Sequence, residues 1–401
     1  MSKKLLYIGD IGISGTSLAV HAQNMARLFQ NIGYEVTMLC DSGNERYYFP
    51  KEIEGLRYCY CKKYCKASSF SSVENVLDEI AGWKFLYCLW RQIRTKKPDL
   101  VVYYGNAGEA AILSLCHKAG IPVVLERVDW FEKADRDRKA AVLLQKYTDW
   151  TMTHTDKKAD GVIAISRYLA EHYEKMGKCV LQVPPIFRFS VEKEIVRTKH
   201  AGELHLVYAG SLGGNKDTIL PVLFAVRKIN QGYLRISMDI VGASVEELEV
   251  LTGESQWEHF GVRAIDRCEN EKAREIVEKA DFSILLRQNK RYAKAGFSTK
   301  FAESMTLGVP VICTRVGGAD SIIQEWIDGV LLENNEVETI CKVLERLLAK
   351  ESEEILKMKQ EAYHTACKNF HISKYREPMR QFLEQVEGSV AKYSFQTKTK
   401  N

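Results

Sequence analysis

Short apolar segments alternate with amphipathic helical segments along most of this chain, and no other feature limits the fold as strongly. The first apolar run, Leu5–Ile8, is followed by a helical pattern at Ser17–Ile32 and by a second run at Glu35–Cys40. A helix between two strands lets the second strand return parallel to the first, whereas a hairpin needs only a short turn. The chain is therefore predicted to be an α/β protein with doubly wound parallel sheets and helices on both faces.

The alternation comes in two series separated by a polar stretch. The first series ends near Pro184 and Pro185, which stop any helix, and the second begins with the apolar run 204–210. We predict an N-terminal Rossmann-like domain at 1–187, a linker at 188–203, a C-terminal Rossmann-like domain at 204–370 and a helical C-terminal tail at 371–401. Because ligands of such sheets bind beyond the carboxyl ends of the strands, we expect the site in a cleft between the two domains.

Composition excludes several classes of protein. The chain carries 57 Lys and Arg against 52 Asp and Glu, and this net charge of +5 falls short of a nucleic-acid-binding signature. No apolar run reaches the ~18 residues of a transmembrane helix, and the N-terminus enters a strand pattern without a signal peptide. The 11 cysteines are odd in number and scattered, which indicates reduced thiols and a cytoplasmic protein.

Residues that bind anions are densest between 281 and 318. A strand ending at Leu286 is followed by a basic loop that begins with Arg287, and the next helix carries Glu303. Arg287 can neutralise phosphate, and Glu303 lies one turn into the helix, where a carboxylate can accept two ribose hydroxyls. Free N–H groups and a cation at the helix start favour phosphate oxygens, and glycine lets the backbone approach them. The residues at this start are Gly296, Phe297, Ser298, Thr299 and Lys300.

A second turn, GSLGGNKD at 210–217, has the same character. It follows the first strand of the C-terminal series and places Gly210 and Lys216 before a helix. Two anion sites and a ribose-binding carboxylate in one domain describe a pocket for a nucleoside diphosphate. The turn after the first strand of the chain carries Gly12 and Gly15, which are candidates for contact with substrate.

The stretch from Gly296 to Pro310 resembles the signature helix of retaining glycosyltransferases of family 4, which have the GT-B fold. GFSTKFAE at 296–303 is similar to a variant branch with a (F/P)-(S/P)-T-K-x-x-E signature. Weaker features follow in the family's order across residues 4–370: the glycine loop at Gly15, a KPD strand at 94–104, a strand at 159–169 and a phosphate-binding lysine at Lys216.

The chain departs from the family's pattern at three places. Ala295 stands where the family has the first glutamate of its Glu-x7-Glu motif, and Ser211 stands where it has an arginine. In the variant branch, Arg287 is the substitute for that arginine. The family's N-domain histidine is missing near 128–129, which leaves Glu126 and Asp129 as alternatives for its place.

The resemblance implies retaining transfer of a sugar from a UDP- or GDP-type nucleotide sugar to a saccharide or lipid-linked saccharide. The setting it implies is synthesis of surface polysaccharide or glycolipid, and the last helices are expected to pack back on the N-terminal domain. The expected catalytic residues are Lys216, Arg287, Glu303 and Asp129. The expected donor-binding residues are Gly15, Gly210, Lys216, Arg287, Gly296, Phe297, Ser298, Thr299, Lys300 and Glu303. The expected acceptor-side residues are Gly12, Glu126 and Asp129.

Neither a metal nor a further cofactor is expected. The cysteine cluster at 58–65 lacks a nearby fourth ligand, whereas structural zinc usually has four. Asp135-Arg-Asp137 matches the Asp-x-Asp motif of metal-dependent transferases, but it falls in a helical stretch. The built-in cations Lys216 and Arg287 make a metal unnecessary for the leaving group.

Three alternatives remain open. Ala295 and Ser211 suit a catalytically silent subunit that binds a nucleotide sugar without turnover. Asp41 ends the second strand, as in a dinucleotide-dependent Rossmann oxidoreductase, although the first turn lacks G-x-G-x-x-G. A sugar-nucleotide epimerase has the same two-domain shape.

Two aromatic, basic stretches bear on location. The helical pattern at 82–97 suits either an anionic membrane surface at the inner face or, as we prefer, a helix whose Phe85, Leu86, Leu89 and Ile93 pack on the sheet. Residues 58–66 are similarly basic and aromatic, so they can add to such a membrane patch.

Overall fold

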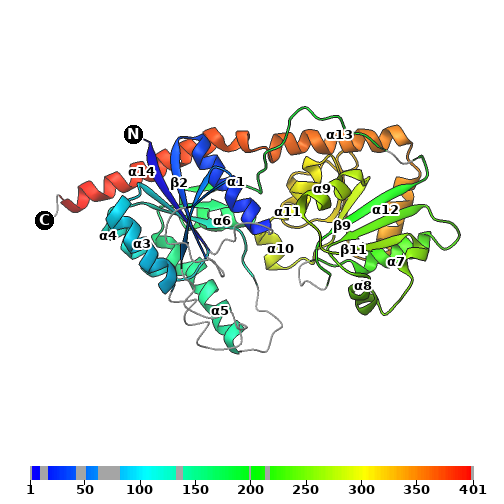
Figure 1. The fold of residues 1–401 in the computed structure, drawn as a ribbon, viewed down its shortest axis with the longest axis horizontal. Helices are drawn as coiled ribbons and strands as arrows, with labels where there is room; N and C mark the ends of the chain where they lie inside the picture. The colour runs from blue at the N-terminus through cyan, green and yellow to red at the C-terminus, as the bar shows by residue number, and fades with distance from the viewer. Residues whose placement is uncertain are drawn as a thin grey trace. The chain divides into compact units, whose positions relative to one another are not determined.

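The computed structural model describes residues 2–9, 17–41, 51–61, 82–131, 139–197, 200–212 and 217–398. The chain divides into two compact units (Figure 1). Unit 1 consists of Met1–Ile186, Ala295–Phe297 and Ile372–Asn401, and unit 2 consists of Phe187–Lys294 and Ser298–His371. Gly12, Gly15, Lys216 and the Asp135–Asp137 motif lie outside the described residues.

Within the described ranges, unit 1 contains a sheet of order β3-β4-β2-β1-β5-β6-β7-β8. Its strands are β1 (Lys3–Gly9), β2 (Tyr34–Asp41), β3 (Lys51–Ile53), β4 (Leu56–Cys61), β5 (Leu100–Tyr104), β6 (Val123–Arg127), β7 (Gly161–Ala164) and β8 (Val180–Gln182). Its helices are α1 (Ser17–Asn31), α3 (Trp83–Lys96), α4 (Glu109–Lys118), α5 (Lys139–Trp150), α6 (Arg167–Lys175) and α14 (Arg376–Lys398). All the described pairings are parallel except that between β3 and β4.

Side chains of β1 alternate between two apolar layers of unit 1, as the pleat of a strand requires. Tyr7 packs with Phe29 of α1 and with Phe382 of α14 on one face of the sheet, whereas Leu6 packs with Leu89 of α3 on the other. Helix α14 therefore forms part of the core of unit 1 although it comes last in the chain. Figure 1 shows it beside this sheet.

Within the described ranges, unit 2 contains a second parallel sheet, of order β11-β10-β9-β12-β13-β14. Its strands are β9 (Leu204–Ala209), β10 (Ile236–Val241), β11 (Val262–Ile265), β12 (Phe282–Leu285), β13 (Val311–Thr314) and β14 (Gly329–Leu332). Its helices are α7 (Leu220–Ile229), α8 (Val245–Thr252), α9 (Asn270–Lys279), α10 (Arg291–Ala295), α11 (Thr299–Thr306), α12 (Val337–Leu348) and α13 (Ser352–Asn369).

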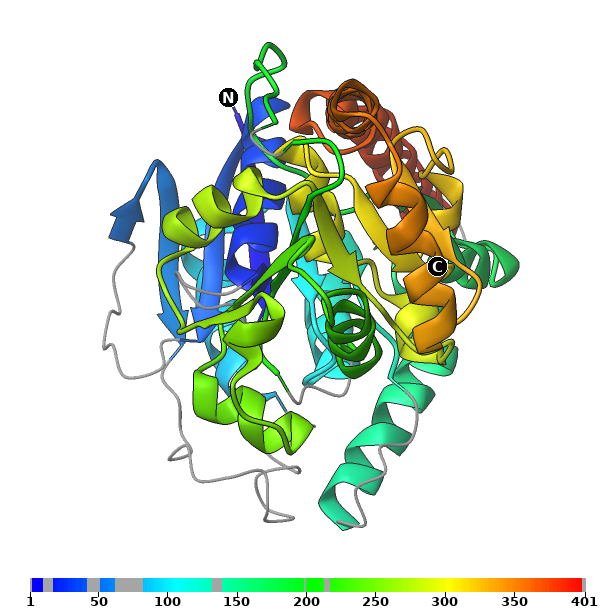
Figure 2. The ribbon, with the colours of Figure 1, turned by 90° about the vertical axis from the view of Figure 1, so that its right-hand side faces the viewer.

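The sheet of unit 2 is covered on both faces. Leu206 of β9 packs with Val222 of α7 and Leu344 of α12, whereas the next residue, Val207, packs with Val277 of α9. Figure 2 shows the strands of unit 2, in green to yellow, between these helices. The prediction of two doubly wound, Rossmann-like sheets with a helical C-terminal tail is confirmed.

The polar stretch at 188–203 belongs to unit 2. Arg197 in this stretch donates from Nε to Oδ1 of Asp281 at 2.8 Å, and both side chains are buried. An ion pair of this kind fixes the polar stretch to the start of β12.

Strands β3, β4 and β11 were not predicted from the sequence, for local reasons. The hairpin of β3 and β4 turns at Glu54 and Gly55, with φ of 50° and 74°. Two-residue hairpin loops favour such angles, but glutamate is a rare residue there, so the turn had no sequence signature. Strand β11 lies at an edge of its sheet, and the exposed Arg263 interrupts its short apolar run.

Candidate functional site

Asp217 in unit 2 brings together two of the cations predicted to bind phosphate. Its Oδ1 accepts a hydrogen bond from Nε of Arg287 at 2.9 Å, and its Oδ2 accepts one from Nζ of Lys300 at 2.6 Å. Asp217 and Arg287 also form an isolated antiparallel bridge, which joins the end of the second glycine turn to the end of β12. Residues from three separate segments thus meet at the carboxyl edge of the sheet.

The electrostatics of this group favour an anion. Burial raises the pKa of Asp217, but Lys300 and Arg287 outweigh burial and hold that pKa below its ordinary value. Asp217 is therefore ionised at neutral pH, and two cations on one carboxylate leave one net positive charge. A partly buried positive charge at this edge attracts a phosphate more strongly than it would in open water.

Lys300 is held in place from two further sides. Its Nζ lies 3.2 Å from the hydroxyl of Tyr208 and 4.6 Å from the centroid of the Tyr208 ring. Gly210 lies next to it, because a Cβ atom built at Gly210 meets Nζ of Lys300 at 2.1 Å. Any side chain at position 210 therefore displaces Lys300. This close approach explains why a glycine stands at the predicted position.

The predicted helix start lies beside this cation group. Ser298 caps α11 by accepting a hydrogen bond from the backbone N–H of Phe301 at 3.3 Å. Phe297 and Ser298 are buried, whereas Thr299 and Lys300 are half-buried. The first free N–H groups of α11 therefore belong to the same site as the Lys300 ammonium.

Glu303 has a partner that the sequence did not indicate. Its Oε1 accepts a hydrogen bond from Nη1 of Arg274, on α9, at 3.0 Å. The side chains of Arg274 and Glu303 are 36% and 34% exposed, so solvent still reaches the pair. Among the described residues no donor bonds to Oε2, and this oxygen remains accessible to a hydroxyl group of a ligand.

The acceptor-side candidates lie at the end of β6 in unit 1. Glu126 is buried, and its two oxygens each have a partner: Nε2 of His21 lies 2.6 Å from Oε1, and the hydroxyl of Tyr7 donates to Oε2 at 2.6 Å. Burial and the neighbouring Glu126 raise the pKa of Tyr7 well above its ordinary value. Asp129, two residues beyond β6, is half-buried.

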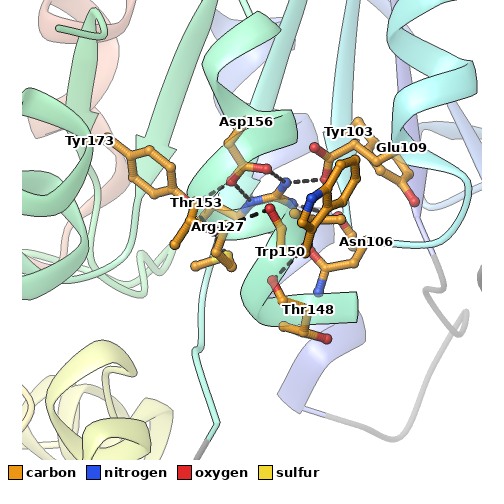
Figure 3. A network of polar contacts seen from close by, with 12 residues as sticks. Tyr103, Asn106, Glu109, Arg127, Thr148, Trp150, Thr153, Asp156 and Tyr173 are labelled. Atoms are coloured by element: carbon orange, nitrogen blue, oxygen red, sulfur yellow. Dashed lines mark hydrogen bonds and ion pairs between the residues drawn. The ribbon is translucent and has the colours of Figure 1, made fainter. Parts of the chain in front are cut away.

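The next residue of β6, Arg127, holds a separate buried network (Figure 3). Its Nε and Nη2 each donate to a carboxylate oxygen of Asp156 at 2.8 Å, and Nη2 also donates to Glu109. Tyr173 donates its hydroxyl to Asp156. Burial raises the pKa of Glu109 well above its ordinary value, whereas Arg127 overcomes the burial of Asp156 and lowers its pKa. This network fixes the end of β6 and hence the segment that carries Glu126 and Asp129.

The structure thus assembles Gly210, Arg287 and Lys300 with the start of α11, and it places Glu303 one turn further along that helix. It adds Asp217, Tyr208 and Arg274 in unit 2, and Tyr7 and His21 in unit 1, which the sequence analysis missed. For these residues, the one indication in the sequence was that Asp217 directly follows the predicted Lys216. The other partners come from distant segments, so their proximity depends on the fold.

Within the described part of the chain, no group of three or more His, Cys, Asp or Glu side chains is arranged to hold a metal. Tyr58 and Cys59, the first residues of the cysteine cluster, are buried in β4 and pack in the core of unit 1. These two residues therefore offer no exposed surface to a membrane, whereas residues 62–66 of the stretch lie outside the described residues. Cys65 lies outside the described residues.

Two protein-family models match the chain in succession. The model described as Glycosyltransferase Family 4 matches residues 18–184, and the model described as Glycosyl transferases group 1 matches residues 203–350. An uncharacterized glycosyltransferase of Methanocaldococcus jannaschii is 24% identical over 203 residues, which are 48% of this chain and 50% of that protein. The chain therefore spans about half the length of the curated relative it matches.

Solved structures with the same fold cover nearly the whole chain. Sucrose-phosphate synthase from Thermosynechococcus elongatus has a TM-score of 0.70 at 13% identity, over 96% of this chain and 100% of that chain. HepE from Anabaena in complex with UDP has a TM-score of 0.62 at 13% identity, over 95% and 99%. HepE has also been solved with UDP-glucose. At such identities the likeness establishes the fold alone.

Proposed function

We propose that the chain is a GT-B glycosyltransferase that transfers a sugar with retention from a nucleotide-diphosphate sugar to a saccharide or lipid-linked saccharide, and the two glycosyltransferase family models that match it in succession support this proposal. The observation that carries the donor half of this proposal is the convergence of Arg287 and Lys300 on Asp217, beside the start of α11. The bound UDP and UDP-glucose of HepE support a uridine donor, and we propose UDP before GDP.

The site supplies what departure of a nucleoside diphosphate needs. As the bond between the sugar and the diphosphate breaks, negative charge grows on the leaving phosphate oxygen. Arg287, Lys300 and the N–H groups of α11 stabilise this charge where it develops. Because these positive groups belong to the chain, the proposed reaction needs no metal.

Retention follows from attack on the face that the leaving group vacates. In the proposed reaction the acceptor hydroxyl bonds to the anomeric carbon while the bond to the diphosphate breaks. The hydroxyl proton passes to an oxygen of the departing phosphate, so no protein nucleophile is required. Glu303, with Arg274 holding one of its oxygens, binds the ribose hydroxyls of the donor through the other.

A thermal-shift screen against UDP, GDP, ADP, NAD and NADP, with and without EDTA, tests the donor site. A ligand at 100 times its Kd adds about 2.7 kcal/mol of stability, enough to detect. We expect one nucleoside diphosphate to stabilise the protein equally in both conditions. Stabilisation by NAD or NADP alone contradicts the proposal and favours the oxidoreductase.

Turnover separates a transferase from a silent binding subunit. With the nucleotide sugar that the screen identifies, we expect release of nucleoside diphosphate by the wild type. Glu303→Ala and Lys216→Ala are each expected to lower this turnover about tenfold or more, equal to about 1.4 kcal/mol of transition-state stabilisation. Nucleotide binding without any turnover favours the silent subunit.

Surface polysaccharide or glycolipid synthesis at the inner face of a membrane is the proposed setting. Among the described residues no helix is long and apolar enough to cross a membrane. Helix α3 packs Phe85 and Leu89 into the core, as preferred from the sequence, while Tyr87 and Trp90 are 57% and 44% exposed. Exposed aromatic and basic side chains on one helix support a peripheral contact with anionic lipid.

A further inference from the structure

A histidine in unit 1 has one ring nitrogen paired and the other buried without a partner. His21, in the second turn of α1, is only 6% exposed, and its Nε2 lies 2.6 Å from Oε1 of Glu126. Among the described residues, no group forms a hydrogen bond with Nδ1. A buried polar atom left unsatisfied costs about 1–3 kcal/mol, so Nδ1 is placed for a partner that the described chain does not supply.

The neighbours of His21 determine which nitrogen carries the proton. Tyr7 donates its hydroxyl to Oε2 of Glu126, and burial keeps that hydroxyl protonated by raising the pKa of Tyr7. With Glu126 as a carboxylate, both of its oxygens accept hydrogen bonds, and Nε2 of His21 donates to Oε1. In the neutral imidazole, Nδ1 then holds a lone pair and can only accept a hydrogen bond.

The position of this group suits a ligand. Tyr7 lies near the carboxyl end of β1, Glu126 near the carboxyl end of β6, and α1 is the helix that follows β1. Parallel sheets bind ligands at this edge. Tyr104, the last residue of β5, is half-buried with its ring centroid 6.4 Å from that of His21. An aromatic ring beside a single oriented acceptor is a combination of groups that suits a hydroxylated ring.

We propose that Nδ1 of His21 accepts a hydrogen bond from a hydroxyl group of the saccharide acceptor, with Glu126 and Tyr7 as positioning residues that fix its tautomer. The proposal rests on the proposed function, because it takes a saccharide as the second substrate. It assigns unit 1 a specific acceptor-binding atom, which Glu126 does not provide because both of its oxygens are occupied by the protein itself.

Nitrogen-15 spectra of histidine-labelled protein test the tautomer without any turnover. We expect the spectrum of His21 to show a proton on Nε2 and none on Nδ1. Glu126→Gln keeps the size of the side chain but presents an amide donor, so the proton is expected to move to Nδ1. A wild-type His21 protonated at Nδ1 overturns the proposal.

The same labelled protein tests binding with methyl glycosides of glucose, galactose, mannose and N-acetylglucosamine as probes. We expect at least one glycoside to shift the Nδ1 signal of His21 in the wild type, and none to do so in Glu126→Gln. No shift with any of the four overturns the proposal. If the wild type turns over no nucleotide sugar, that result instead contradicts the proposed function. Failure of the His21 proposal and failure of the proposed function are therefore distinguishable.

Kinetics then separate acceptor binding from a structural role. His21→Gln retains an amide donor toward Glu126 but lacks an acceptor at Nδ1. For the glycoside that shifts His21, we expect its KM in transfer to rise about tenfold, with donor hydrolysis by water within twofold of wild type. His364→Gln, the same change at an exposed helical position, is the matched control. Equal losses of transfer and hydrolysis, or an unchanged KM, overturn the proposal.

Discussion

Nη1 of Arg274 donates a hydrogen bond to Oε1 of Glu303 at 3.0 Å, so a neighbouring helix holds the carboxylate proposed to bind ribose. Arg274 lies on α9 and Glu303 on α11, and no spacing in the sequence connects them. The pair leaves one carboxylate oxygen for a ligand and limits the directions in which that oxygen points. Arg274 is therefore a positioning residue for the donor site.

Arg274→Ala is expected to raise the KM for the donor with little change in kcat. Half-exposed ion pairs contribute about 0.2–1 kcal/mol, so we expect an increase of up to about fivefold, smaller than that of Glu303→Ala. The control is Arg227→Ala, which breaks a similarly exposed pair with Glu254 elsewhere in unit 2. Steady-state kinetics in which the two variants behave alike contradict the positioning role.

Asp217→Asn is expected to lower kcat about tenfold or more, because Arg287 and Lys300 lose the carboxylate that orients them. Both cations remain, so we expect the affinity for the nucleoside diphosphate product to change less than kcat. Calorimetric titration and initial rates measure the two quantities separately.

Asp239 offers a matched control for this variant. It also pairs with two basic side chains of unit 2, Arg263 at 2.9 Å and His205 at 3.0 Å. Asp239→Asn therefore removes a comparable carboxylate, and we expect it to affect stability but not kcat. Equal kcat values for the two variants refute the role of Asp217 in the site.

The sequence predicted the fold well, because the features that specify parallel sheets are local. Apolar runs such as 282–286 correspond to strands such as β12 within a residue or two. The GT-B fold, expected from the resemblance at Gly296–Pro310, is confirmed by the likeness to sucrose-phosphate synthase over 96% of this chain. What the sequence lacked was a signal for pairs that only tertiary structure forms.

The candidate site shows the same limit. Arg287 and Lys300 could be selected individually, because each follows a strand or begins a helix. Their common partner Asp217 could not, since its antiparallel bridge with Arg287 spans distant segments. His21 is a similar case: its sequence suggests only a helical residue, and its significance depends on Glu126 from another strand.

Lys359 gives unit 2 a distinctive pH dependence. It is buried on α13 and donates to the carbonyl of Ala280, and burial lowers its pKa from 10.5 to about 8. A lysine pKa lowered by folding destabilises the protein while the group is charged in the folded state. The penalty is fully present below about pH 8 and is relieved as pH rises toward 10.5.

Lys359→Met removes this contribution. The stability of the wild type minus that of the variant is expected to rise between about pH 7 and pH 10.5, by up to about 3 kcal/mol. The comparison cancels the tyrosines and other groups common to both proteins. Urea denaturation, followed by the transition of unit 2, measures the difference at each pH. A difference independent of pH contradicts a lowered pKa for Lys359.

The exposed face of α3 is expected to bind anionic membranes. The rings of Tyr87 and Trp90 are stacked with their centroids 6.3 Å apart, and the guanidinium of Arg94 lies 5.0 Å from the centroid of the Trp90 ring. An aromatic pair with an adjacent cation can insert its rings among headgroups and pair with their phosphates.

We expect the protein to sediment with vesicles that contain phosphatidylserine and to sediment little with phosphatidylcholine alone. Added salt is expected to weaken the binding to phosphatidylserine. The double change Trp90→Ser and Arg94→Ser should reduce binding, whereas Tyr233→Ser, at an exposed aromatic of unit 2, should not. Equal binding by all three proteins contradicts a membrane role for α3 and leaves it as a helix that covers the sheet.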